Sequence, residues 1–211
     1  MKIFTESISK YLEETFKKDS KDLLITDVLS ILFISVNGLD DNNKKLKIDY
    51  KDLELFKNLK YLEIADANIT NKTIDILSEL EYLENVVFRN CTFNRQVKNL
   101  DKLKNIKSIR VLNCKNFDIT YLKELDNLER LYISDKTLDN LNNFNTLKLE
   151  ALDISECNLK NDLGLDKVHT NYLVLSGEQY NKFKEKILNL NMRIMIMADP
   201  SNGYYIEKWL N

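Results

Sequence analysis

The sequence predicts an α/β solenoid, in which each copy of a short repeat adds one strand to a curved parallel sheet. Residues 149–159 read Leu-Glu-Ala-Leu-Asp-Ile-Ser-Glu-Cys-Asn-Leu, a pattern of the form L-x-x-L-x-I-x-x-C-x-L. The pattern recurs along most of the chain, with its second apolar position at residues 32, 62, 86, 109, 131, 152, 173 and 194. Successive differences between these numbers are 30, 24, 23, 22, 21, 21 and 21, so the period settles at 21–22 residues and indicates about eight stacked repeats.

The composition is that of an ordinary globular protein. Of the 211 residues, 44% are hydrophobic and 30% are charged, and the net charge is −2, so no excess of positive charge favours nucleic acid or an acidic membrane. The first residues lack the apolar core of a secretory signal, and no apolar run is long enough to span a membrane. We therefore expect a cytoplasmic protein with reduced thiols and no membrane partner.

Residues 1–27 precede the repeats and are expected to form a helical N-terminal cap. A second short helix is expected to lead into Ile25–Val28. Such a segment would cover the apolar edge of the first repeat, and the alternative is a helix that binds a membrane surface or a partner. The apolar positions that share one face of the first helix are Ile8, Tyr11, Leu12 and Phe16.

The repeats are assigned to residues 28–199, and the first copy is read with Leu32 and Ile34 as its inward pair. Side chains alternate between the two faces of a strand, so the two apolar residues of each L-x-L core point into the solenoid. The residues between and beside them point outward, onto the concave face of the sheet. At the first repeat the outward residues are read as Ile31, Phe33 and Ser35.

Segments between the strands carry apolar residues at every third position, as at Leu122 and Leu125, which favours 3₁₀ turns on the convex side. The segment Glu178–Leu190 is the exception and is predicted to be a helix. Ser176 and Gln179 have the spacing of a capping box at its start. Its helical stripe consists of Tyr180, Phe183, Ile187 and Leu190.

Residues 200–211 follow the last repeat and are expected to form a C-terminal cap. Pro200 stops the repeat pattern. An apolar tail suits a cover over the final repeat, and the alternative is a segment that binds a partner. The apolar residues of this tail are Tyr204, Tyr205, Ile206, Trp209 and Leu210.

The repeats between residues 29 and 199 resemble those of leucine-rich repeat proteins, and their length is similar to that of the internalin-like class, with repeats of about 22 residues. The sequence Ile25-Thr26-Asp27-Val28 before the first repeat resembles the helical cap of that class. The resemblance implies a right-handed solenoid with a parallel sheet on the concave side and 3₁₀ or short helical segments on the convex side. Internalins are secreted, whereas this chain shows no export signal, and this departure argues against an expectation of adhesion to host cells.

The asparagine or cysteine position of each repeat turns inward and satisfies backbone groups of the turn. Cys91, Cys114 and Cys157 occupy it, so a structural role is expected for all three. The first two fall in neighbouring repeats, but a disulfide is not expected in a reducing compartment. Copies that depart from the pattern at this position carry Lys136, Glu178 and Asp199.

No catalytic or cofactor-binding constellation is present in the sequence. His169 is the single histidine and is expected at an ordinary surface or turn position. The sequence contains no phosphate-binding loop, nucleophile elbow, zinc-protease motif or dinucleotide fingerprint. We therefore expect a protein that is not an enzyme and that uses neither a metal nor a cofactor.

Arginine is concentrated on the predicted concave face. Four of the five arginines fall on its 24 outward positions, and none of the 26 lysines does, although an even distribution would place about three lysines there. Arginine and tyrosine are enriched at protein interfaces and lysine is depleted, which favours a binding face; the alternative is that lysine suits the convex loops. The residues predicted to contact a partner are Val87, Arg89, Arg110, Leu112, Arg130, Tyr132, Asp153, Tyr172 and Arg193.

The predicted face is mixed in character: arginines and aromatic residues at its centre are followed by Asp135, Asp153 and Glu156 and by an apolar end. This mixture favours a protein partner over a nucleic-acid duplex, which would need a broad basic stripe. We therefore predict a non-catalytic protein-interaction module, monomeric on its own, such as a bacterial scaffold, an immunity protein or an effector inhibitor. The alternative is a nucleic-acid-associated regulator that uses the arginine cluster.

Overall fold

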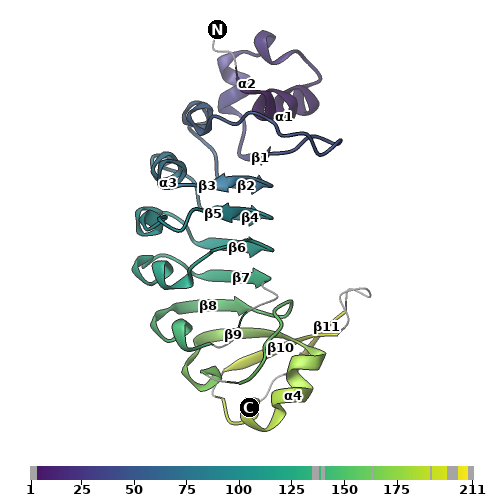
Figure 1. The fold of residues 1–211 in the computed structure, drawn as a ribbon, viewed down its shortest axis with the longest axis vertical. Helices are drawn as coiled ribbons and strands as arrows, with labels where there is room; N and C mark the ends of the chain where they lie inside the picture. The colour runs from purple at the N-terminus through teal and green to yellow at the C-terminus, as the bar shows by residue number, and fades with distance from the viewer. Residues whose placement is uncertain are drawn as a thin grey trace.

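The computed structural model describes residues 4–134, 138, 141–162, 164–190, 192–198 and 204–208, with the backbone alone at residues 121, 197–198 and 204–208. Nine strands of this part form one sheet, and helices and 3₁₀ segments are stacked along one side of it (Figure 1). The first eight strands of the sheet are all parallel, and each lies beside the next copy of the repeat. The predicted α/β solenoid of eight repeats is confirmed.

The parallel strands are β1 (Phe33–Asn37), β2 (Tyr61–Ala65), β4 (Asn85–Arg89), β6 (Ser108–Leu112), β7 (Arg130–Ser134), β8 (Lys148–Asp153), β9 (His169–Ser176) and β10 (Arg193–Ala198). Two short strands, β3 (Asn68–Ile69) and β5 (Thr92–Phe93), pair beside the main sheet. The convex elements are η2 (Tyr50–Leu55), α3 (Asn71–Ser78), η3 (Asn99–Lys102), η4 (Ile119–Glu124), η5 (Asn142–Thr146), η6 (Leu165–Lys167) and α4 (Gly177–Ile187).

The core is a continuous column of the inward residues of successive repeats. The inward pairs from β2 to β9 are at most 4% exposed, because each is covered by the pairs of the coils above and below. Apolar residues of the convex segments, such as Phe56 and Phe144, close the column on its other side and are also buried. The inward pairs are Leu62 and Ile64, Val86 and Phe88, Ile109 and Val111, Leu131 and Ile133, Leu152 and Ile154, and Leu173 and Leu175.

The first repeat is shifted by two residues from its sequence prediction. Ile34 of β1 lies opposite Leu62, at the position that the prediction gave to Leu32. Ile34 is fully buried, whereas Leu32 is 51% exposed. Apolar residues alternate through this segment and fit the repeat in two registers, and the structure adopts the one that buries Val36 as the second inward residue. The outward residues are therefore Phe33, Ser35 and Asn37, and Ile31 is buried.

Three short helical elements precede the sheet: α1 (Glu6–Phe16), η1 (Ser20–Asp22) and α2 (Ile25–Leu29). The predicted helix face is confirmed, since Ile8 and Leu12 are fully buried and Tyr11 and Phe16 pack against the core. Asp52 is 3% exposed and anchors this region, because its Oδ2 accepts hydrogen bonds from the backbone N–H (2.6 Å) and the hydroxyl (2.8 Å) of Thr5. α2 extends past the expected boundary of the cap at residue 27.

The helix α3 replaces the 3₁₀ turn that the sequence predicts in this repeat. Its start is a capping box in which the Thr70 hydroxyl accepts from the backbone N–H of Thr73, and the Thr73 hydroxyl accepts from that of Thr70, both at 3.3 Å. Threonine takes the place that glutamate or glutamine holds in the usual box. The repeat is also longer than those that follow, with 24 residues from Leu62 to Val86, which leaves room for two helical turns.

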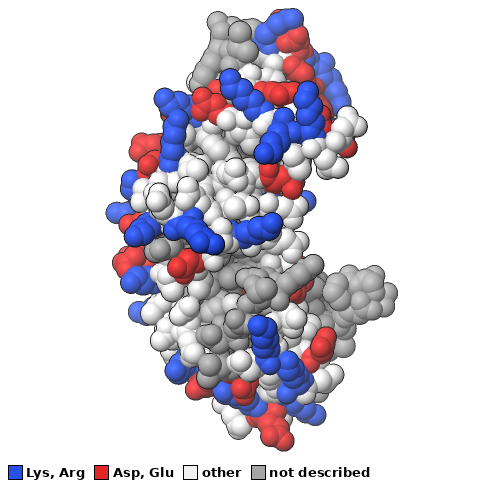
Figure 2. All heavy atoms as spheres, in the orientation of Figure 1, with Lys and Arg blue, Asp and Glu red and all other residues white. Residues whose placement is uncertain are grey.

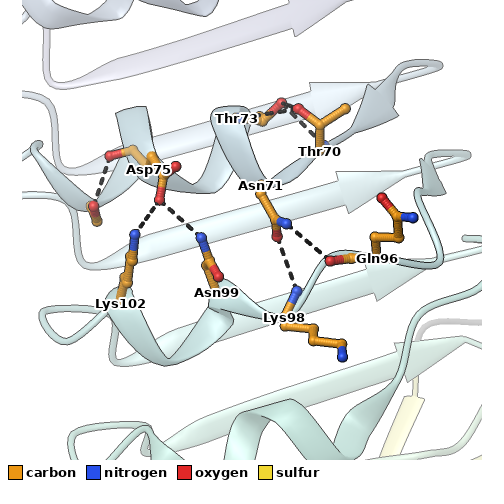
Figure 3. Close-up of polar contacts among 9 residues, drawn as sticks. Thr70, Asn71, Thr73, Asp75, Gln96, Lys98, Asn99 and Lys102 are labelled. Carbon is orange, nitrogen blue, oxygen red and sulfur yellow. Dashed lines mark hydrogen bonds and ion pairs between the residues drawn. The ribbon is translucent and has the colours of Figure 1, made fainter.

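Polar side chains join α3 to η3 of the next repeat (Figure 3). The Asp75 carboxylate accepts from Lys102 Nζ (2.6 Å) and Asn99 Nδ2 (3.1 Å), and these two contacts lower the pKa of Asp75. Asn71 Nδ2 donates to the backbone carbonyl of Gln96 (3.0 Å). The convex sides of the two repeats are therefore held together by side chains as well as by the core.

The inward cysteines donate to backbone carbonyls of the preceding repeat, as their position in the pattern predicts. Cys91 Sγ donates to Ile64 O (3.3 Å) and Cys157 Sγ donates to Ile133 O (3.0 Å). In the next repeat, where the consensus position holds Glu178, the donor is the neighbouring Gln179. Its buried Nε2 donates to Ile154 O (2.8 Å) and Cys157 O (2.7 Å).

The predicted helix near the C-terminus is α4, and its capping box is confirmed. The Ser176 hydroxyl accepts from the backbone N–H of Gln179 (3.1 Å), and Gln179 Oε1 accepts from that of Ser176 (2.8 Å). After β10, the chain adds β11 (Tyr204–Lys208), which pairs antiparallel with β10. Of the predicted tail residues, Pro200, Trp209 and Leu210 lie outside the described residues, as do Asp135, Lys136 and Asp199. In the described part of the chain, no helix is long and apolar enough to cross a membrane.

Candidate partner-binding face

The register of the strands places the predicted contact residues in three rows on the concave face. The first row is Phe33, Tyr61, Asn85, Ser108, Arg130, Ala151, Tyr172 and Arg193. The middle row is Ser35, Glu63, Val87, Arg110, Tyr132, Asp153, Val174 and Met195. The third row contains Asn37, Ala65, Arg89, Leu112 and Ser134.

Arg110 and Tyr132 form the centre of this face. They lie directly opposite each other on β6 and β7, and the guanidinium carbon of Arg110 lies 4.8 Å from the centroid of the Tyr132 ring. This is the geometry of a cation–π contact, which holds the long arginine side chain in place. Burial raises the pKa of Tyr132, and a hydrogen bond to Glu156 raises it further. Tyr132 therefore stays neutral, and its hydroxyl donates a hydrogen bond to Glu156.

Asp153 follows Tyr132 in the middle row and is partly buried. Burial raises the pKa of its carboxyl, and the hydrogen bonds that Ser155 donates from its backbone N–H (3.0 Å) and its hydroxyl (2.7 Å) act in the opposite direction. The sequence prediction put Ser155 in the third outward row. The structure places it in a turn after β8, where it is 8% exposed and fixes the Asp153 side chain.

Arg89 is partly neutralised within the face. Its Nη2 lies 2.6 Å from Glu63 Oε1 on the neighbouring strand β2, and the exposed fractions of the two side chains are 50% and 15%. An ion pair with one half-exposed partner contributes little stability, but it fixes where the Arg89 guanidinium lies. Arg89 therefore offers a partner its remaining donors in a set position.

Arg193 and Tyr172 form a second arginine–tyrosine pair at the other end of the face. They lie opposite each other on β10 and β9. Arg193 Nη1 donates to the Tyr172 hydroxyl at 2.7 Å, and the guanidinium carbon lies 5.4 Å from the ring centroid. Arg110 and Arg193 are thus both ordered by a tyrosine on the adjacent strand, which lowers the entropy that either side chain would lose on binding a partner.

Arg130 is one of two exposed arginines in the first row, and its side chain makes no hydrogen bond or ion pair with another described residue. It stands on β7, two residues before Tyr132 and on the strand next to that of Arg110. Two guanidinium groups on adjacent strands are therefore directed to the concave side, and neither forms an ion pair with a carboxylate of the described residues. Their hydrogen-bonding capacity remains for a molecule outside the chain.

Two of the predicted contact residues differ from the arginines in exposure. Val87 occupies the middle row but is only 2% exposed, so it supports the surrounding side chains and offers almost no surface to a partner. Leu112 is partly exposed. Row position alone predicts the face to which a side chain belongs, but the long side chains of neighbouring rows decide how much of it remains accessible.

An aromatic group at the N-terminal end of the face was not among the predicted contacts. The Phe33 ring centroid lies 5.0 Å from that of Tyr61 and 6.2 Å from that of Tyr11, and Phe33 is 42% exposed. Tyr11 comes from α1, so only the packing of the cap against β1 could bring it here. The shifted register of the first repeat also contributes, because it makes Phe33 the direct neighbour of Tyr61.

The other polar features do not form a second site of comparable kind. His169 is exposed at the start of β9, and it borders an open hollow of about 630 Å³ together with Lys148 and Glu150. Among the described residues, no group of three or more His, Cys, Asp and Glu side chains is placed to hold a metal ion. Figure 2 shows basic and acidic residues interspersed along the helical side of the view, without a broad stripe of one sign.

No protein-family model matches the chain, and no curated protein matches it. Among solved structures, it is similar to an internalin (inlF) from Listeria monocytogenes, with 16% identity, a TM-score of 0.54, and coverage of 93% of this chain and 65% of that chain. It is also similar to internalin C2 (inlC2) from the same species, with 14% identity, a TM-score of 0.44, and coverage of 81% and 93%. The chain thus spans about 65% of the length of the first, and that likeness shows the fold alone.

Proposed function

We propose that this leucine-rich repeat protein, whose fold is that of the internalins, binds a protein partner through its concave face and catalyses no reaction. The observation that carries the proposal is the pair Arg110 and Arg130, which stand on adjacent strands and form no ion pair with a carboxylate of the described residues. Arginine and tyrosine are the residues that most often contribute large binding energies at protein interfaces.

The extent of the face also supports a macromolecular partner. Eight parallel strands at about 4.8 Å spacing make a surface of roughly 38 Å, which is longer than any small molecule needs. Its character changes along this length, from the aromatic group around Phe33, through the arginine centre, to the partly buried Asp153. A protein surface can present a complementary patch to each of these regions, whereas a nucleic acid presents the same negative charge along its whole length.

Ordered arginines favour tight binding, because little conformational entropy is left to lose. Arg89 is held by Glu63, Arg110 by Tyr132 and Arg193 by Tyr172. A scaffold, an immunity protein or an effector inhibitor of the bacterial cytoplasm would need such a preformed face. We propose a role of this kind for a chain that is monomeric before it meets its partner.

The test is capture of the partner from the native host, followed by binding measurements with purified proteins. The variant Arg110→Glu combined with Tyr132→Ala should reduce the affinity at least a hundredfold, because it reverses one charge and removes the ring that orders it. Arg95→Glu is the matched control, since Arg95 is the one arginine outside the concave rows and is exposed. Circular dichroism should show the same fold for both variants.

Binding that survives the double variant would move the site away from this face. The salt dependence separates the proposal from the alternative of a nucleic-acid-associated regulator. Association with DNA or RNA that falls steeply between low and moderate salt, and that requires Arg89, Arg110 and Arg130 together, would favour the alternative. A protein complex whose dissociation rate changes little with salt would support the proposal.

A further inference from the structure

Cys91 and Cys114 lie opposite each other on neighbouring coils of the solenoid. The register of β4 and β6 pairs Arg89 with Leu112, and the same offset continues to a parallel bridge between Thr92 and Lys115. Backbone hydrogen bonds join the two coils at this bridge, including one from Lys115 N–H to Cys91 O at 2.8 Å. Neighbouring parallel strands lie about 4.8 Å apart, which falls inside the range of Cα separations that a disulfide spans, about 4.4–6.8 Å.

The side chains of the two cysteines also face the same space. Cys114 Sγ donates to Phe88 O at 3.3 Å, a carbonyl on the coil that carries Cys91, so its thiol is directed toward that coil. A hydrogen bond between the two thiols lowers the pKa of Cys91 and raises that of Cys114. Cys91 is fully buried, whereas Cys114 is partly exposed. One thiol of the pair can therefore meet a small reagent, and the other lies directly behind it.

We propose that Cys91 and Cys114 are a modification site, at which a low-molecular-weight disulfide such as oxidised glutathione closes a disulfide between two repeats. Cys114, as the thiolate, attacks one sulfur of the reagent, forms a mixed disulfide and releases the first glutathione thiolate. Cys91, as the thiolate, then attacks the Cys114 sulfur and displaces the second glutathione. Two protein thiols lose two protons and two electrons, and one oxidised glutathione becomes two reduced molecules.

The order of the two steps has a kinetic consequence. The raised pKa of Cys114 keeps its thiolate scarce, which makes the first step slow. The second step is intramolecular and therefore fast, because Cys91 lies directly opposite Cys114 on the neighbouring coil. The mixed disulfide at Cys114 is therefore not expected to accumulate in the wild-type protein.

Cys157 provides an internal control. It occupies the same inward position, is 5% exposed, and donates to Ile133 O at 3.0 Å, so its local environment resembles that of Cys91. No cysteine stands on either neighbouring coil, since the corresponding positions are Lys136 and Glu178. Cys114 is two coils away, about 10 Å, which is beyond the reach of a disulfide.

The new bond would lie two residues beyond Arg89 and Leu112, at the end of two strands of the concave face. It would fix the spacing of these two coils at that edge, and loop closure would raise the stability of the folded chain. In a reducing glutathione pool the pair remains two thiols. The oxidation state of the pair would therefore couple the redox state of the surroundings to this edge of the concave face.

The test treats the folded full-length protein with oxidised glutathione, then denatures it and alkylates the remaining thiols before intact-mass measurement and peptide mapping. The expected product has lost two hydrogens, about 2 Da, carries one alkylated cysteine, Cys157, and yields a peptide that links Cys91 to Cys114. Its thermal midpoint should rise by several degrees and return to the original value after reduction.

Two variants complete the experiment. Cys157→Ser should form the same disulfide at the same rate, whereas Cys91→Ala should stop at the glutathione adduct of Cys114. If Cys91→Ala does not fold, the wild-type mass and peptide map still decide. Three alkylated cysteines in a protein that stayed folded, a persistent adduct at Cys114 of the wild type, or a disulfide that includes Cys157 would each overturn the proposal.

Discussion

The phenolic hydroxyl of Tyr11 donates a hydrogen bond of 2.6 Å to the backbone carbonyl of Phe33. Tyr11 belongs to α1, and Phe33 begins β1, the first strand in the order of the sheet. At the other end of β1, the backbone N–H of Asn37 donates to the hydroxyl of Ser7, also on α1, at 3.0 Å. Two side chains of one helix thus satisfy backbone groups at both ends of β1. β1 is an edge strand with no coil before it, so no strand on that side can pair with these groups.

Tyr11→Phe is expected to lower the free energy of unfolding by about 0.5–1.5 kcal/mol, because the hydrogen bond is lost while the ring contact with Phe33 is kept. Urea unfolding followed by circular dichroism measures the change. Tyr82→Phe is the matched control: Tyr82 is 50% exposed and makes no hydrogen bond with another described residue. Equal stability of the two variants would show that the Tyr11 hydroxyl does not hold α1 to the sheet.

Asp52→Ala should cost about 2–3 kcal/mol, since it removes a buried carboxylate that accepts two hydrogen bonds from Thr5 and leaves the backbone N–H of Thr5 unpaired. Asp49→Ala serves for comparison, because Asp49 is exposed and its carboxylate accepts a local hydrogen bond from the backbone N–H of Lys51. Hydrogen exchange should show faster opening of residues 6–16 in Asp52→Ala. Unchanged exchange there would contradict the anchoring role.

Gln179→Leu is expected to destabilise the protein by about 2–4 kcal/mol. The leucine fills a similar volume, but the carbonyls of Ile154 and Cys157 each lose one of two donors inside the solenoid, and the Ser176 N–H loses its acceptor. Glu178→Leu, at the consensus position itself, should have a much smaller effect because Glu178 is exposed. Thermal unfolding that ranked the two variants in the opposite order would refute the assignment of the donor to Gln179.

Tyr50 is expected to make the protein sensitive to alkaline pH. Burial raises the pKa of Tyr50 above its value of 10.0 in an unfolded chain, so the unfolded state releases its proton first as the pH rises. The stability contributed by the neutral form is complete below pH 10 and is lost progressively above it. Tyr50→Phe should therefore reduce the loss of stability between pH 10 and 11, as measured by urea unfolding at each pH.

The same variant has a second expected effect at neutral pH. The Tyr50 hydroxyl is buried and has no hydrogen-bond partner among the described residues, so removing it relieves the cost of an unpaired polar group, about 1–3 kcal/mol. Tyr50→Phe is expected to be at least as stable as the wild type at pH 7. A clear loss of stability there would mean that the hydroxyl is satisfied by a buried water molecule.

The repeats could be predicted from the sequence for two reasons. Apolar residues alternate along each strand with a period of two, and the length of the repeat is nearly constant. From β2 onward, every strand lies in the register that its L-x-L core predicts. The first repeat could not be placed this way, since its alternating apolar residues satisfy the pattern in either of two registers. Contact with α1 and with β2 decides between them, and both contacts are tertiary.

The membership of the concave face was predictable, but the state of each side chain on it was not. Sequence alone placed Arg110 and Tyr132 on adjacent strands, and the structure adds that one orders the other. Val87 was predicted by the same rule and is buried, because the rule carries no information on the side chains around it. Tyr11 was missed because it joins the face from outside the repeats.

The antiparallel strand β11 limits the stacking of one copy of this protein on the next. A stack of identical parallel coils has two complementary ends, so copies could add head to tail into a filament without limit. Here the first edge is occupied by hydroxyl groups of α1, and at the last one the chain direction reverses against β10. A second copy that approached β11 would meet a strand of opposite polarity, which breaks the translational repeat that filament growth requires.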